Sequence, residues 1–412
     1  MRVITEPVSD VRSVALGLWV ANGSADETES EAGTSHLLEH MLFRGTPRLT
    51  SREVDELFDS LGAEINAATD RETTVLYTRV LDVHLEQAFA ALGEMLVEPA
   101  FESLETEREV VLEEIAMYED DPQDRIFDVS GELLYDGNPL GRPVLGKAEV
   151  VGAMTPERLR AFHDQHYTAP GLVVAAAGSL EHERIVALAE KHLAGLKDAP
   201  APAPPPVAKV RTGGMRFFEK ETEQFHVCLG GPGLGRDDER RFALRVLEGA
   251  LGGTTSSRLF QLIRERHGLA YAVFTYSNLH EGCGDVGVYL GTRPDNLQRA
   301  LELLAEELAS VAGGSLTDTE IQRARENLKG RVAISQESSA ARMHHIGSAL
   351  LLGLPVLTLE QTIERIDAVG SDEVRALAAE LYSPGRLSIA GIGPDEAQFH
   401  AASGPFEGVL AQ

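Results

Sequence analysis

The chain has 412 residues, 43% of them hydrophobic and 25% charged, which are proportions typical of soluble globular proteins. This length fits two domains better than one. The net charge of −28 argues against nucleic acid as a partner, because phosphate binding requires a basic surface, and it favours cationic ligands such as basic peptides.

No run of apolar residues is long enough to span a membrane, and the N-terminal residues lack the pattern of a signal peptide. The two cysteines, Cys228 and Cys283, are too few for a disulfide framework. These features together predict a cytoplasmic protein in a reducing compartment.

The first half of the chain begins with an apolar strand over residues 14–20 and a loop rich in glycine and acidic residues. A helix capped by Thr34 or Ser35 follows, and then two strands joined as a hairpin within residues 62–80. An amphipathic pattern near residues 85–99 and a strongly acidic pattern over residues 105–122 predict two further helices.

The first of these helices carries a candidate metal site within the segment TSHLLEHMLFRGT, residues 34–46. His36 and His40 are one helical turn apart, so both imidazoles can reach one cation. Glu39 lies beside them and fits a general base, as in the inverted H-x-x-E-H motif of zinc peptidases. Two histidines can also lie on an ordinary solvated helix face. A set of two histidines and a glutamate suits zinc, although manganese or cobalt could occupy it.

A third ligand is expected from the acidic helix, because a catalytic zinc needs three protein ligands and one open position. Glu107 and Glu114 are two turns apart and therefore share one face. Glu114 could bind the metal, and Glu107 could orient a ligand by a hydrogen bond. Glu113 is the rival ligand, since spacing alone does not separate the two neighbours. A charge-rich helix is also a common solvated surface.

The second half repeats this order after a proline-rich segment at residues 199–208, which favours extended polyproline geometry. It has a strand near residue 226, a helix from Asp237 toward Leu251, two strands and another amphipathic helix. In both halves a Tyr, a Pro and a Gly precede a closing apolar strand, about 215 positions apart.

The repeats predict an α+β fold of two homologous domains, each an α/β sandwich with a largely antiparallel sheet and helices on one face. The predicted domains are residues 1–198 and 209–412, joined by the linker at residues 199–208.

At these motifs the sequence resembles the pitrilysin family of metallopeptidases, in particular bacterial processing peptidases and the mitochondrial processing peptidase β subunit. HLLEHMLFRGT is similar to the family's metal-binding helix, and the segment from Glu107 to Glu114 is similar to its second motif. The resemblance implies that zinc is held by His36, His40 and Glu114 rather than Glu113. It also implies that Glu107 supports the site.

Two further segments carry the resemblance. Arg264 and Tyr271 match residues that, in the family, reach the substrate and the developing oxyanion. They also fit a charged helix end and a half-buried strand. Asn66 and Ala67 match the family's substrate-binding edge strand, to which a peptide adds as an extra strand. Ala68 replaces the phenylalanine of many members, which puts any side-chain preference of that position in doubt.

The resemblance implies a clamshell of two domains in which only the first binds zinc. Glu320 and Asn327 have the spacing of the acidic pair in the second half, but no histidine pair accompanies them. His344 and His345 are adjacent and are interpreted as structural. The resemblance also implies a homodimer, or pairing with a second subunit of the same fold.

The favoured function is a zinc-dependent endopeptidase that cleaves unfolded peptides or presequence-like segments. The alternative is a non-catalytic scaffold or partner subunit of the same fold, because some relatives have lost the metal residues. A peptide-binding protein that holds zinc but turns over slowly is a third hypothesis.

Overall fold

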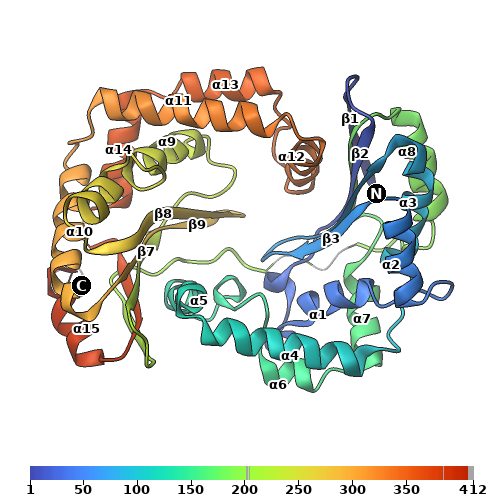
Figure 1. Ribbon diagram of the computed structural model, residues 1–412, viewed down its shortest axis with the longest axis horizontal. Helices are drawn as coiled ribbons and strands as arrows, with labels where there is room; N and C mark the ends of the chain where they lie inside the picture. Colours follow the sequence, from blue (N-terminus) through green and yellow to red (C-terminus); the bar gives the residue numbers. More distant parts are fainter. Residues whose placement is uncertain (201–202, 204, 384, 407–412) are drawn as a thin grey trace. The chain divides into compact units, whose positions relative to one another are not determined.

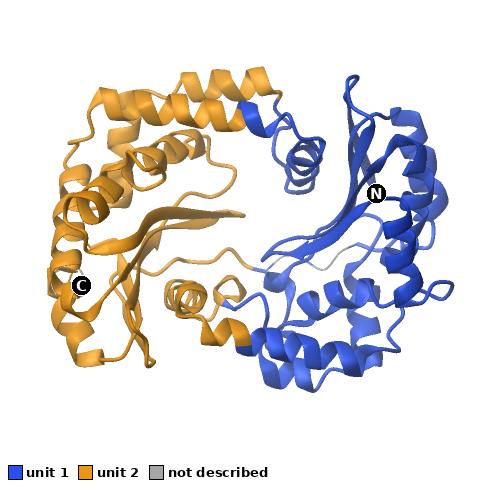
Figure 2. Ribbon diagram, viewed as in Figure 1, with its two compact units in different colours: residues 1–116, 142–205, 333–357 blue, residues 117–141, 206–332, 358–412 orange. Residues whose placement is uncertain are grey.

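The computed structural model describes residues 1–200, 203, 205–383 and 385–406. The chain forms two compact units, coloured separately in Figure 2. Unit 1 comprises Met1–Ala116, Arg142–Pro205 and Ala333–Leu357, and unit 2 comprises the remaining segments. The change between units falls after Pro205, inside the segment predicted as a linker, of which residues 201–202 and 204 lie outside the described residues.

The sheet of unit 1 has the strand order β1-β5-β2-β4-β3. Only the β1–β5 pair is parallel, and the other three pairs are antiparallel. The order places β3 at an edge, where it pairs with β4 alone among the described strands. The bounds are β1 (Arg2–Pro7), β2 (Ser13–Val20), β3 (Glu64–Thr69), β4 (Thr74–Leu81) and β5 (Leu172–Gly178).

The larger core of unit 1 lies between one face of this sheet and the helices that cover it (Figure 1). Alternate residues of β2, namely Val14, Leu16 and Leu18, point into this core because successive side chains of a strand face opposite sides. The helices are α1 (Thr34–Leu42), α2 (Ser51–Ser60), α3 (Leu85–Val97), α4 (Leu104–Asp120), α6 (Ala148–Gly152), α7 (Pro156–His166) and α8 (His182–His192).

Unit 2 has the same topology, with the strand order β6-β10-β7-β9-β8 and a single parallel pair, β6–β10. Its strands are β6 (Met215–Glu219), β7 (Phe225–Pro232), β8 (Ala270–His280), β9 (Cys283–Thr292) and β10 (Ser388–Gly393). Its helices are α9 (Arg241–Leu251), a π-helix (Phe260–Arg266), α10 (Leu297–Ala312), α11 (Asp318–Ser335), α13 (Leu359–Asp367), α14 (Ser371–Leu381) and α15 (Glu396–Ala402).

The two halves of the sequence exchange one helix each. Near the end of α4 the chain leaves unit 1, and α5 (Pro122–Tyr135) packs in unit 2. Near the end of α11 it leaves unit 2, and α12 (Ser339–Leu351) packs in unit 1 (Figure 2). The predicted domain bounds at residues 198 and 209 follow the linker and do not include this exchange.

Each exchanged helix covers the second face of its sheet. Met343 and Ile346 of α12 form a small core with the other set of β2 residues, including Trp19. The approach is close, because a Cβ atom on Gly347 would lie 2.3 Å from Nε1 of Trp19. In unit 2, the α5 residues Ile126, Val129 and Leu133 pack against Cys228, Tyr289, Ala390 and Ile392.

The prediction of two alike α+β domains with largely antiparallel sheets is confirmed. The expectation that helices cover only one face is incomplete, since the second faces carry α12 and α5. The helix expected from Asp237 begins later, at Arg241. Within the described residues, no helix combines the length and hydrophobicity needed to cross a membrane.

Candidate metal centre

Helix α1 is fixed at its start by a buried carboxylate from a preceding loop. The predicted caps, Thr34 and Ser35, lie inside the helix, and Gly33 occupies the N-cap with φ 97°. The Glu27 side chain instead accepts hydrogen bonds from the backbone N–H groups of Gly33 (2.8 Å) and Ser35 (2.6 Å). A Cβ at Gly33 would lie 2.6 Å from the carbonyl oxygen of Leu145. Both the positive φ and this close approach therefore favour glycine at the position.

The structure brings His36, His40 and Glu114 together. One ligand atom from each lies within 4.8 Å of the others, and no second group of three metal-binding side chains occurs in the described part of the chain. Nε2 of His40 is 3.3 Å from Oε2 of Glu114, and Nε2 of His36 is 3.7 Å from Oε1. Donors about 2.0–2.1 Å from a tetrahedral ion lie roughly 3.3–3.5 Å apart. The spacing therefore fits zinc.

The protonation of His36 also fits a metal ligand. Burial, reinforced by the neighbouring His40, lowers the pKa of His36 to about 4. The imidazole is therefore neutral near pH 7, as a ligand must be. Glu113 is exposed and does not belong to the group, so the geometry places Glu114 at the site and its rival outside it.

Glu107 lies behind the ligands, with only 2% of its surface exposed. Nδ1 of His40 is 2.8 Å from Oε1 of Glu107, and the Arg44 guanidinium donates to the same oxygen from 3.0 Å. Nδ1 of His40 therefore donates to Glu107 when Nε2 faces a metal. Glu107 was expected from the sequence, whereas Arg44, which follows the end of α1 at Leu42, was not.

Glu39 lies between the ligands and the edge strand. Burial raises the pKa of its carboxyl group, and hydrogen bonds from the side chain and backbone of Thr69 in β3 oppose this shift. Oε2 of Glu39 is buried and has no hydrogen-bond partner among the described residues. A carboxylate with a raised pKa and an unused oxygen suits proton transfer. Thr69 was not identified from the sequence.

Strand β3 contacts the site through Thr69, and its edge opposite β4 pairs with no other described strand. Ala67 is buried toward the core and pairs with Leu76, whereas Asn66 is exposed and pairs with Tyr77. The Asn66 side chain accepts a hydrogen bond from the backbone N–H of Ala67 (2.9 Å). A peptide could extend the sheet at this edge by β-augmentation.

Arg264 and Tyr271 lie together in unit 2. Tyr271 is 77% exposed at the start of β8, and the Arg264 guanidinium carbon is 4.5 Å from the centre of its ring. Nη1 of Arg264 donates to the carbonyl oxygen of Tyr271 (3.2 Å). Tyr271 lies at the start of a half-buried strand, as in the alternative interpretation of this segment, but its own side chain is presented to solvent. The role of both residues in catalysis stays a prediction.

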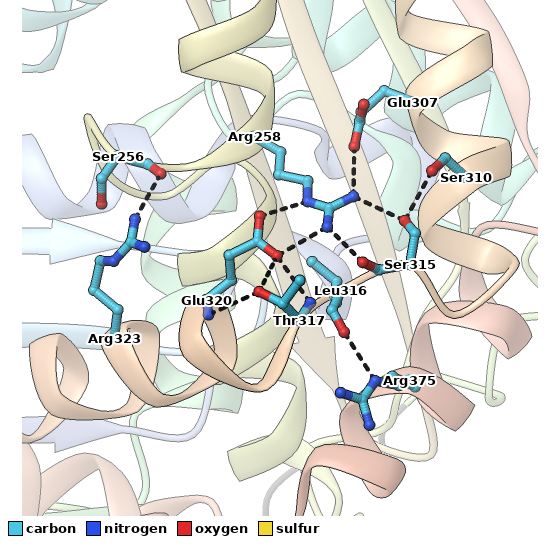
Figure 3. Close-up of polar contacts among 10 residues, drawn as sticks. All are labelled: Ser256, Arg258, Glu307, Ser310, Ser315, Leu316, Thr317, Glu320, Arg323 and Arg375. Carbon is cyan, nitrogen blue, oxygen red and sulfur yellow. Dashed lines mark hydrogen bonds and ion pairs between the residues drawn. The ribbon is translucent and has the colours of Figure 1, made fainter.

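Unit 2 has an ion-pair network around Arg258 that includes Glu320, the first residue of the acidic-pair spacing in the second half (Figure 3). Glu320, at the start of α11, receives hydrogen bonds from Nε of Arg258 (2.7 Å) and from Thr317. The bond from Arg258 is the main reason that the pKa of Glu320 falls to about 2. Both carboxylate oxygens of Glu320 accept hydrogen bonds from Arg258, so Glu320 acts here as an anchor for Arg258.

His344 and His345 hold α12 in place. The His344 ring packs edge-on against Trp19 (5.3 Å between centroids) and Tyr77 (4.9 Å). Nε2 of His345 is 2.9 Å from the carbonyl oxygen of Leu357. Both contacts are structural, and neither histidine belongs to the metal-binding group.

Comparison with known proteins gives a consistent result. Residues 2–148 match the family model described as insulinase (peptidase family M16), and residues 153–328 match the model described as peptidase M16 inactive domain. A protein of Streptomyces coelicolor, described as an uncharacterized zinc protease, is 42% identical over 96% of this chain and 88% of its own. A Bacillus subtilis protein with the same description is 36% identical over 93% of this chain and 94% of its own.

Two solved structures share the fold. An M16 inactive domain from Pseudomonas fluorescens superposes with a TM-score of 0.90 over 95% of this chain and 96% of its own, at 24% identity. A protease from Helicobacter pylori gives a TM-score of 0.87 over 95% of this chain and 97% of its own, at 20% identity.

Proposed function

The chain belongs to the M16 peptidase family, and from this premise we propose that it is an endopeptidase that hydrolyses unfolded peptides or presequence-like segments. Zinc is its cofactor. The observation that carries the proposal is the convergence of His36, His40 and Glu114 beside Glu39, whose unused oxygen lies next to an edge strand.

Different residues would bind the metal, orient its ligands and transfer protons during hydrolysis. His36, His40 and Glu114 would hold the zinc, and Glu107 would keep the His40 ring in the tautomer that presents Nε2. When bound, zinc supplies Lewis-acid chemistry that activates water and polarises a carbonyl group near neutral pH. Glu39 would accept a proton from the attacking water and pass it to the leaving amine.

Substrate binding is assigned to β3 and to two residues of unit 2. The backbone of β3 around Asn66 and Ala67 would pair with an extended peptide, which requires the substrate to be locally unfolded. Arg264 and Tyr271 carry hydrogen-bond donors suited to the developing oxyanion. The net charge of −28 favours basic peptides through long-range attraction. We further propose a homodimer, or a heterodimer with a subunit of the same fold.

The test combines metal content with cleavage. Elemental analysis is expected to give about one zinc per chain, since three ligands and one open position make a single site. A quenched basic peptide should be cleaved, cleavage should stop with a chelator, and added zinc should restore it. A Glu39→Gln variant that retains zinc is the matched control for contaminating peptidases. A protein that binds zinc or lacks it, but never cleaves, would favour the scaffold alternative.

A further inference from the structure

A cavity lies within unit 1, and none of the proposed zinc ligands lines it. Its volume is about 970 Å³, which is in the range of small-molecule sites. The walls are the loop at residues 44–52, the segment at residues 97–103, and α7 residues including Arg160. All of these belong to the blue unit of Figure 2.

Four arginines line this cavity, although acidic residues outnumber basic ones by 65 to 37 in the chain. They are Arg44, Arg48, Arg52 and Arg160. Guanidinium groups bind phosphate and carboxylate groups through two parallel hydrogen bonds, so such a cluster is suited to an anion.

Two of the four arginines are already engaged in the protein. Arg44 pairs with the buried Glu107, and Arg48 pairs with Glu94, whose side chain is 10% exposed. Neither carboxylate lines the cavity. The charges of these two arginines are therefore balanced by their partners, and both side chains have little freedom to rearrange.

The other two arginines are available to a ligand. Among the residues that the structure describes, Arg52 pairs only with Glu56, in an exposed contact on one helix that contributes little to stability. Arg160 stacks on Phe101, with 4.8 Å between its guanidinium carbon and the ring centre. It forms no ion pair with any residue that the structure describes, so its hydrogen-bond donors remain for a bound group.

The cavity also has acidic lining residues, namely Glu98, Glu102 and Asp164. Asp164 is neutralised by Lys197, whose Nζ is 2.9 Å away. Glu98 and Glu102 are exposed and can turn into solvent. We propose that the cavity binds a small multivalent anion, a phosphorylated or polycarboxylate compound, through Arg160 and Arg52.

The site is connected to the metal centre by Arg44. This residue lines the cavity and donates to Glu107, which in turn holds Nδ1 of His40. An anion bound beside Arg44 competes with Glu107 for its positive charge, which weakens the Arg44–Glu107 pair without a large movement and so changes the support of His40. This coupling rests on the proposed function, whereas binding of the anion does not.

Isothermal titration calorimetry of the zinc-loaded protein at constant ionic strength tests the proposal. The two probes are inorganic phosphate and tricarballylate, and zinc content is measured after each titration. Saturable binding is expected for at least one probe; phosphate alone indicates a phosphorylated ligand, and tricarballylate alone a polycarboxylate. Failure of both to bind saturably overturns the proposal.

Variants locate the binding. An Arg52→Ala, Arg160→Ala double variant should bind about tenfold or more weakly, because charge-assisted hydrogen bonds are lost. The Arg160→Ala single variant, which removes an exposed side chain, should weaken binding in the same direction. Arg12→Ala is the matched control, since Arg12 is an 81% exposed arginine of unit 1 outside the cavity. Equal binding by the double variant and the control overturns the site.

Cleavage measured with and without the probe separates this proposal from the peptidase assignment. A protein that binds the probe but cleaves no peptide keeps the anion site and loses the proposed function. A peptidase that binds neither probe keeps the function and loses the site. A rate that changes with probe in the wild type but not in the double variant supports coupling between the cavity and the metal centre, and an unchanged rate in the wild type contradicts it.

Discussion

His40 and Glu107 are joined through the His40 ring nitrogen that faces away from the proposed zinc: Nδ1 lies 2.8 Å from Oε1 of a carboxylate that is 2% exposed. A buried carboxylate is costly unless it is paired, and here Arg44 compensates it. The pair therefore fixes the tautomer and the orientation of His40 before any metal arrives.

Replacing Glu107 with glutamine should weaken zinc binding by about 10- to 100-fold, as expected for a residue that supports a metal ligand. The loss should be visible in a competition titration with a chelator of known affinity. Melting curves of the metal-depleted protein provide the control for a general loss of fold. Unchanged zinc affinity would contradict the supporting role of Glu107.

Glu114→Ala should lose zinc, because it removes one of three protein ligands. Glu113→Ala is the matched control, since it deletes the neighbouring and exposed glutamate of the same helix. Zinc content after dialysis measures both. The reverse result would assign the ligand to Glu113 and require a different orientation of α4.

Glu39→Gln should reduce cleavage by about 10²–10⁴-fold, which is the usual contribution of a general base. Zinc content should stay near that of the wild type, because Glu39 is not one of the proposed ligands. Single-turnover cleavage together with elemental analysis checks both points. Loss of the metal in this variant would mean that Glu39 does more than transfer protons.

Tyr271→Phe should lower turnover by up to about 10²–10³-fold, because it removes one donor for the oxyanion. The side chain is 77% exposed, so the substitution should leave the fold and the zinc content unaffected. Steady-state kinetics on the quenched peptide provide the measurement. A wild-type rate would exclude the Tyr271 hydroxyl from the mechanism.

The Glu27 carboxyl predicts a dependence of stability on pH. Burial raises its pKa from 4.5 to about 7, despite the N–H groups of Ser35 and Gly33. The folded protein thus binds this proton more tightly than the unfolded chain does. Its contribution to stability is complete below about pH 4.5 and is lost as pH rises through about 7.

A comparison of wild type and Glu27→Gln isolates this effect. Melting midpoints of the metal-depleted proteins should show the wild type losing stability relative to the variant between about pH 5 and pH 8, by up to roughly 3 kcal/mol. Removal of the metal prevents zinc binding from adding its own pH dependence. Parallel curves for the two proteins would show that Glu27 is ionised throughout the range.

The metal helix could be predicted from the sequence because its signal is local: two histidines and a glutamate within five residues define one face of one helix. The place of Glu114 at that face depends on how α4 packs against α1, which helical spacing does not encode. The carboxylate that caps α1 could not be predicted from local spacing either. Glu27 accepts a hydrogen bond from the backbone N–H of Gly33, which lies six residues later, and this contact depends on the fold of the intervening loop.

The exchange of α5 and α12 could not be predicted from the hydrophobic pattern of the sequence either. Both helices have an apolar stripe, and both sheets have a second apolar face, so amphipathicity does not determine which helix covers which sheet. The repeat revealed the number and order of elements in each half. The partner of each exchanged helix is decided only in the folded protein.

The exchange of α5 and α12 predicts how the protein would respond to cleavage of its chain between the two halves. Although the proline-rich segment marks the middle of the sequence, the two pieces on either side of it are not self-sufficient, because each piece keeps the helix that the other piece's sheet needs. A break of the peptide bond in this segment would leave two fragments that each present a complementary apolar helix to the other. We therefore expect the two fragments to associate through these reciprocal helices without a covalent connection.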